Sequence, residues 1–150
     1  MAGPVTHAYS TTLDRSGLAL AMGAVLGGAT TLVLVAAGGQ FSPANLIVAF
    51  LLGTLLSAIA IVAVAGPVWL ILHLSGKRGP SSAVLTGAFL AFLLLLAGQT
   101  WGFGLAAMPP IDGRTLLYRW ASAAAVSLLA AGIGATIGWA MWRVAYRKDR

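Results

Sequence analysis

LIVAFLLGTLLSAIAIVAVAGPVWLILHL occupies residues 46–74 and contains no Asp, Glu, Lys or Arg. About 20 apolar residues in an α-helix are enough to cross the hydrocarbon core of a membrane, which is about 30 Å thick. The alternative for such a run is a helix buried on all sides by a soluble core, and a chain of 150 residues has no core of that size. The stretch therefore predicts a transmembrane helix.

Three further apolar runs, residues 18–37, 83–103 and 120–142, are also long enough to span a membrane. Charged residues make up 8% of the chain, against about 25% in a soluble domain. The mean hydropathy is +0.93, so lipid is the expected solvent for most of the surface. We expect an all-α integral membrane protein, in which residues 1–150 form a single four-helix transmembrane bundle and residues 1–16 a polar cytoplasmic tail.

Local signals mark the ends of these runs. Ser42 and Pro43 stand where an N-cap and the first helical residue would precede the second run. By the same reasoning Ser81 or Ser82 is expected to cap the third helix, and Asp112 the fourth.

The distribution of basic residues predicts the orientation in the membrane. If the amino terminus is cytoplasmic, that side carries seven Lys and Arg side chains and the other side carries Arg114 and Arg119. Positive residues are retained on the cytoplasmic side, so both termini are expected there. We expect a multi-pass protein of a bacterial inner membrane. The basic side chains near the spans should contact lipid headgroups: Lys77, Arg78, Arg143, Arg147 and Lys148.

Small residues recur at four-residue spacing on every predicted span. Helices in lipid associate by close packing, which small side chains permit. We therefore expect these positions to pack the four helices of the chain, with Gly134-x-x-x-Gly138 as the alternative candidate for docking another protein. The positions are Gly23 and Gly27, Gly53 and Ser57, Gly87 and Ala91, and Gly134 and Gly138.

Gly66-Pro67 interrupts the second span about two turns before its end. Proline lacks the N–H group that continues the helix, and its ring clashes with the preceding turn, so a kink is expected there. Broken helices line substrate sites in some transporters, but we interpret this proline as a bend in a long helix.

Few residues offer chemistry. His73 lies at the end of a span and is the one candidate cofactor ligand, through a ring nitrogen, with an interfacial histidine as the alternative. No motif for a nucleotide, a phosphate or a metal appears, and Ser, His and acidic residues do not converge. The basic residues flank apolar runs and form no stripe, which argues against nucleic-acid binding. We expect no enzymatic activity, no catalytic residue and no bound cofactor or metal.

Three functional hypotheses remain. The first is a non-catalytic accessory or scaffold subunit that packs against a larger membrane complex. The second is a small homo-oligomeric channel or carrier for an uncharged or anionic solute. The third is a cofactor-binding membrane subunit that uses His73. The expected partners are the lipid bilayer and either another membrane protein or further copies of the chain.

Overall fold

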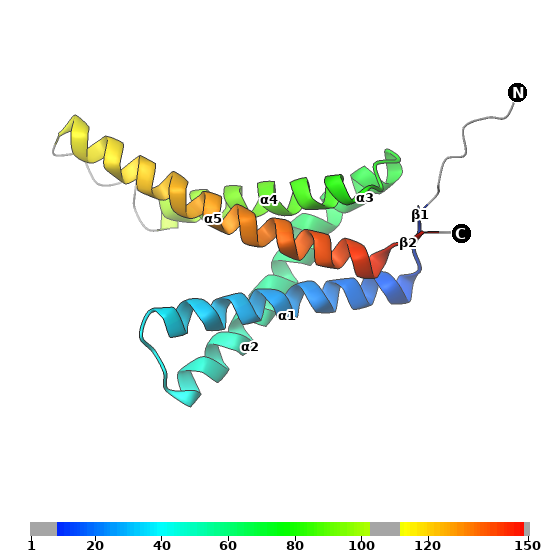
Figure 1. The fold of residues 1–150 in the computed structure, drawn as a ribbon, viewed down its shortest axis with the longest axis horizontal. Coiled ribbons are helices and arrows are strands. Elements are labelled where there is room, and N and C mark those ends of the chain that lie inside the picture. The colour runs from blue at the N-terminus through cyan, green and yellow to red at the C-terminus, as the bar shows by residue number, and fades with distance from the viewer. Residues whose placement is uncertain (1–8, 103–111, 149–150) are drawn as a thin grey trace, which may run out of the picture.

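The computed structural model describes residues 9–102 and 112–148, and these residues are almost entirely helical (Figure 1). Two interruptions are π turns, η1 and η2, in which the helix is locally wider. Two-residue strands β1 and β2 precede the first helix and follow the last. In chain order the elements are β1 Tyr9–Ser10, α1 Leu13–Ala37, α2 Pro43–Ala60, η1 Ile61–Ala65, α3 Gly66–Leu74, α4 Pro80–Ala97, η2 Gly98–Gly102, α5 Gly113–Ala145 and β2 Arg147–Lys148.

Four continuous helical segments are long and apolar enough to cross a membrane, as predicted. They are Leu13–Ala37, Pro43–Leu74, Pro80–Trp101 and Gly113–Ala145. Each begins several residues before the apolar run that predicted it, because polar residues occupy the first turn. The predicted end of the third span, at residue 103, lies outside the described residues.

The expected polar tail, residues 1–16, is described from Tyr9 onward. Residues 13–16 form the start of α1, and Tyr9–Ser10 pair in antiparallel register with Lys148 and Arg147. Residues 1–8 lie outside the described part of the chain.

Two polar side chains cap helix starts. The Thr115 backbone N–H donates to Asp112 Oδ1 over 2.8 Å at the start of α5, as predicted. The Arg15 N–H donates to Thr12 Oγ1 over 3.4 Å at α1. At α2, Pro43 takes the first helical position, but Ser42 makes no capping hydrogen bond.

The prediction that Ser81 or Ser82 caps the third helix was wrong. The N-cap of α4 is Gly79, and Ser82 Oγ instead donates back to the carbonyl oxygens of Lys77 and Gly79. Because Pro80 fills the first helical position, the two serines occupy the second and third helical positions, which lie past the N-cap.

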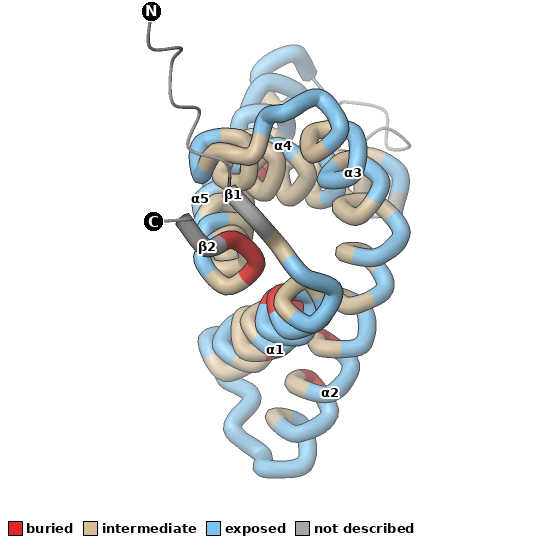
Figure 2. Tube along the Cα trace, turned by 90° about the vertical axis from the view of Figure 1, so that its right-hand side faces the viewer, coloured by how far each residue is buried: buried red, intermediate tan, exposed pale blue. Residues whose placement is uncertain are grey.

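The helices form two antiparallel pairs, α1 with α2 and α4 with α5 (Figures 1 and 2). Small residues lie at both contacts. Gly27 faces Ser57, and Gly53 faces Thr31 and the Cα atom of Gly28. In the other pair, Gly87 lies against the Gly134 carbonyl and the Gly138 Cα atom, and Gly134 also faces Ala91.

The two pairs meet where α1 crosses α5, near the end of the molecule that carries β1, β2 and the α3–α4 turn, which we call the termini end. Ala19 of α1 is buried there together with Ala145 and Tyr146. One turn further along α1, Gly23 contacts Met141 of α5 and Ile61. Away from this end the two ribbons diverge (Figure 1), and Val33 and Leu34 of α1 are 61% and 62% exposed.

A π-helical turn, η1, interrupts the regular α-helical bonding between α2 and α3. The Gly66 N–H donates to the Ile61 carbonyl, five residues earlier, which is the π-helical bond that closes η1. The extra residue in this turn moves the preceding carbonyls away from the Pro67 ring, which carries no N–H of its own. A π turn thus stands where the sequence predicts a kink, and the helix continues through it to Leu74.

Candidate functional site at the termini end

Five side chains from α3, the α3–α4 turn and the end of α5 meet at the termini end. We call them the aromatic cluster: Trp69, His73, Arg78, Trp142 and Tyr146. Two of the pairs in it, Trp69 with His73 and Trp142 with Tyr146, are spaced four residues apart and therefore lie on the same side of their helix.

His73 is held by aromatic contacts and one hydrogen bond. Its Nδ1 lies 3.0 Å from the hydroxyl of Tyr146. Its ring centroid is 5.1 Å from that of Trp69 and 6.2 Å from that of Tyr146. The Tyr146 and Trp142 rings are stacked in turn, with centroids 6.3 Å apart. This series of rings fixes α3 against the last turn of α5.

Tyr146 is the most buried member of the cluster, with 8% of its surface exposed. Burial raises the pKa of its hydroxyl above the ordinary value for tyrosine, and the hydrogen bond with Trp69 and the positive charge of Arg78 oppose the rise. Trp69, by contrast, is 37% exposed, so the cluster has a buried side against α5 and an open side.

The α3–α4 turn is tied to the cluster by its backbone. Gly76 has a φ of +74°, and the Lys77 N–H reaches back to the Leu72 carbonyl, which is the usual way a glycine ends a helix. The Trp142 indole N–H donates to the Arg78 carbonyl over 3.0 Å, and Arg78 Nε donates to the His73 carbonyl over 3.4 Å. Both bonds set the direction in which Arg78 leaves the turn.

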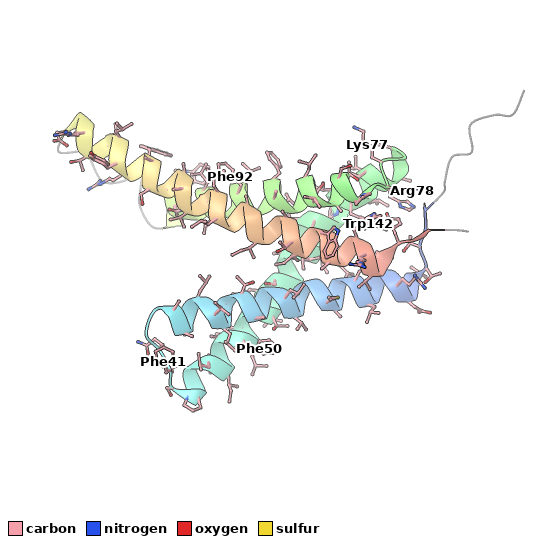
Figure 3. All side chains as sticks on the ribbon, viewed as in Figure 1. Phe41, Phe50, Lys77, Arg78, Phe92 and Trp142 are labelled. Carbon is pink, nitrogen blue, oxygen red and sulfur yellow. The ribbon has the colours of Figure 1, made fainter. Side chains whose placement is uncertain are left out.

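The remaining basic residues are placed differently. Figure 3 shows Lys77 pointing away from α5, whereas Arg78 points toward the end of that helix. Lys77 is exposed and Arg78 is partly buried. Arg143 lies on the exposed side of α5 with its guanidinium carbon 5.0 Å from the centre of the Trp139 ring. Arg147 and Lys148 form β2, and their side chains lie outside the described part of the structure.

A second polar contact joins η2 to α5. Gln99 Nε2 donates to Ser127 Oγ over 3.1 Å and to the Ala123 carbonyl over 3.3 Å, and Ser127 is fully buried. The carboxamide therefore faces α5, and these bonds secure the end of the α4–α5 pair opposite to the aromatic cluster.

As for a metal or cofactor, no group of three His, Cys, Asp or Glu side chains lies close enough to hold a metal ion among the described residues. His73 offers one ring nitrogen, Nε2, beside the hydrogen-bonded Nδ1. A ligand on Nε2 requires the proton to reside on Nδ1, which then donates to the Tyr146 hydroxyl. A single histidine in this setting is a weak candidate for an iron ligand.

The chain was compared with protein families, curated proteins and solved structures, and none of them matches it.

Sequence reasoning singled out His73 and Arg78 but missed Trp142 and Tyr146 as their partners. The four-residue spacing of Trp142 and Tyr146 indicated a shared helix face at the end of the last span. It gave no sign that this face meets α3, because 73 residues separate His73 from Tyr146.

Proposed function

We propose that this chain is a non-catalytic subunit of a bacterial inner membrane, where it packs against a larger membrane protein. The observation that supports this most directly is the open arrangement of the two helix pairs. They are joined at the termini end through Ala19, Gly23 and Met141, and they diverge beyond it (Figure 1). A membrane subunit that leaves its helix pairs apart at one end offers surfaces on which another helix can pack.

A further surface is the exposed side of α5 that faces away from α4, which we call the outer face of α5. It consists of small residues together with larger ones near its middle and end: Ser122, Ala125, Leu129, Gly132, Thr136 and Trp139. A Cβ atom added at Gly132 would meet nothing within 4 Å, so this glycine serves no contact within the described chain. Small and hydroxyl-bearing residues favour helix contact in lipid, where a lipid-facing surface gains nothing from them.

The proposed orientation places both termini and the α3–α4 turn in the cytoplasm. The basic side chains Arg15, Lys77, Arg78 and Arg143 all belong to that side, which agrees with the retention of positive charge there. The aromatic cluster would then lie at the cytoplasmic membrane interface, where Trp and Tyr are enriched.

Purification of the tagged chain from its native membrane in mild detergent, followed by mass spectrometry, tests the proposal. We expect one larger membrane protein at constant stoichiometry. Gly132→Leu should reduce its recovery, because the added side chain fills open space on the outer face of α5. Leu56→Phe, at a position on α2 that is 64% exposed, is the matched control and should not. Recovery of a lone monomer, or equal recovery from both variants, argues against the proposal.

One observation favours a carrier as a second candidate function. The π turn η1 and Gly66-Pro67 lie between the α1–α2 pair and α3, and α3 is bound to the end of α5 through His73 and Tyr146. The segment therefore joins two helix groups at a point where the regular helical bonding is interrupted, which is a suitable place for a rocking motion.

Proteoliposomes that contain this protein alone distinguish the carrier from the subunit. Solute uptake that Pro67→Ala slows, with the folded protein still incorporated, supports a carrier. The absence of flux across uncharged and anionic solutes removes it and leaves the subunit proposal unaffected.

A further inference from the structure

Arg78 has a guanidinium group whose direction is set by the fold. The Schellman-type turn at Gly76 fixes the backbone, and the Trp142 indole holds the Arg78 carbonyl at 3.0 Å. Arg78 Nε then donates to the His73 carbonyl over 3.4 Å. Because Nε is used in this way, the two terminal nitrogens of the guanidinium remain as a fork of further donors.

Among residues 9–102 and 112–148, this fork has no carboxylate as a counter-ion. Asp14 and Asp112 are the acidic residues of the described chain, and no carboxylate there lies within 4.0 Å of a basic nitrogen. Asp112 begins α5, at the far end of that helix from Tyr146. A partly buried guanidinium with its direction fixed and no carboxylate beside it is a suitable receptor for an anion from outside the chain.

The position of Arg78 in the molecule favours one class of anion, the phosphate of a lipid. The α3–α4 turn joins two membrane-crossing helices, so Arg78 lies at the level where the lipid headgroups are. Trp69, partly exposed beside His73, adds an aromatic surface of the kind that lies at the membrane interface. A phosphate attached to a lipid would be presented to Arg78 from that same level.

We propose that Arg78 binds the phosphate of an anionic phospholipid, with the guanidinium fork donating to two phosphate oxygens and the aromatic cluster holding the fork in place. Lys77 and Arg143 contribute general attraction to the anionic surface, because their side chains are exposed and point elsewhere. The site is a distinct position on the molecule, and it requires neither a partner protein nor transport activity.

Native mass spectrometry and thermal unfolding in nanodiscs test this proposal. The probes are phosphatidylglycerol in a phosphatidylcholine background, phosphatidylcholine alone, and inorganic phosphate with phosphatidylcholine. Phosphatidylglycerol should raise the unfolding temperature of the native chain and remain bound in the mass spectrometer. Arg78→Gln should weaken this binding about tenfold or more, the effect of losing a charge-assisted pair of hydrogen bonds.

Lys77→Gln and Arg143→Gln are matched controls, because each removes one positive charge close to the same membrane surface. They should weaken binding far less than Arg78→Gln. Arg78→Lys keeps the charge but not the fork, and an intermediate loss from it supports the proposal even if Arg78→Gln does not fold. Equal losses from all three single-charge variants would show diffuse surface attraction and overturn the proposal. An equal stabilisation by inorganic phosphate would show that no lipid is needed and would overturn it as well.

Discussion

A few side-chain hydrogen bonds hold α3 and the α3–α4 turn against the end of α5 at the termini end. From α3, His73 Nδ1 reaches the hydroxyl of Tyr146 at the end of α5 over 3.0 Å, and Trp69 forms a hydrogen bond with the same residue. In water such a bond contributes about 0.5–1.5 kcal/mol to stability. Tyr146 is almost fully buried, so its hydroxyl depends on protein partners, among them His73 and Trp69, for its hydrogen bonds.

We therefore expect Tyr146→Phe to lower the free energy of unfolding by about 1 kcal/mol, because the ring stacking stays and the hydroxyl is lost. Circular dichroism during thermal unfolding in detergent measures the change. Tyr118→Phe is the control, since the Tyr118 side chain is 66% exposed on α5 and should leave the transition where it was. Identical transitions for the two variants would contradict a structural role for the His73–Tyr146 bond.

The same hydroxyl predicts a dependence on alkaline pH. Burial raises the pKa of Tyr146 in the folded chain, so the folded state holds this proton at a pH where the unfolded state, with a tyrosine pKa of about 10, has released it. The unfolded state then binds fewer protons, and stability falls as the pH rises above about 10. Tyrosinate absorbance should show one late-titrating group in the native chain that is missing from Tyr146→Phe.

At the scale of helices, some glycines of α5 lie against the backbone of α4, and others face open space. Gly134 and Gly87 each lie against the other's carbonyl oxygen, so neither can accept a side chain unless α4 and α5 separate. Gly132 stands two residues from Gly134, on the outer face of α5, and has room for a Cβ atom. One helix thus contains both kinds of glycine within a single turn.

Gly134→Ala should therefore destabilise the α4–α5 pair by about 1–3 kcal/mol, the usual cost of overpacking. Gly132→Ala should be neutral or slightly stabilising in the isolated chain, because alanine is the better helix former. Equilibrium unfolding in detergent compares the two variants. Comparable losses from both would mean that the contact between α4 and α5 is not where the structure places it.

The sequence predicted the helices well because each depends on local composition. The run at residues 46–74 has no charge to interrupt it, and small residues such as Gly87 and Gly134 recur at helical spacing. It did not predict which stripes face each other, because all four spans contain a stripe of small residues and the spacing alone does not determine which helices pair. It also missed η1, because the clash of the Pro67 ring can be relieved by a bend or by an extra residue in the turn.

At the scale of the whole molecule, the pairing of β1 with β2 brings both chain ends to one end of the bundle. If the four helices cross a membrane, we therefore expect both termini on the same side of it, whichever side that is. We expect the α1–α2 connection, residues 38–42, on the opposite side.

Reporter fusions test this arrangement together with its proposed direction. Green fluorescent protein attached to either terminus should fluoresce, because it folds in the cytoplasm. Alkaline phosphatase should be active only when inserted in the α1–α2 connection. Opposite results for the two termini would contradict the structure itself. A consistent reversal at all three positions would contradict only the proposed cytoplasmic location of the termini.

The β1–β2 pairing also affects the order in which the protein can be completed. Residues 9–10 leave the ribosome long before residues 147–148, so β1 waits without its partner while four helices are made. During that interval α1 has neither Ala145 nor Tyr146 to pack on. The first helix to emerge is therefore among the last to complete its contacts. A nascent chain stalled before α5 would connect the α1–α2 pair to α4 through η1 and α3, without the crossing of α1 and α5.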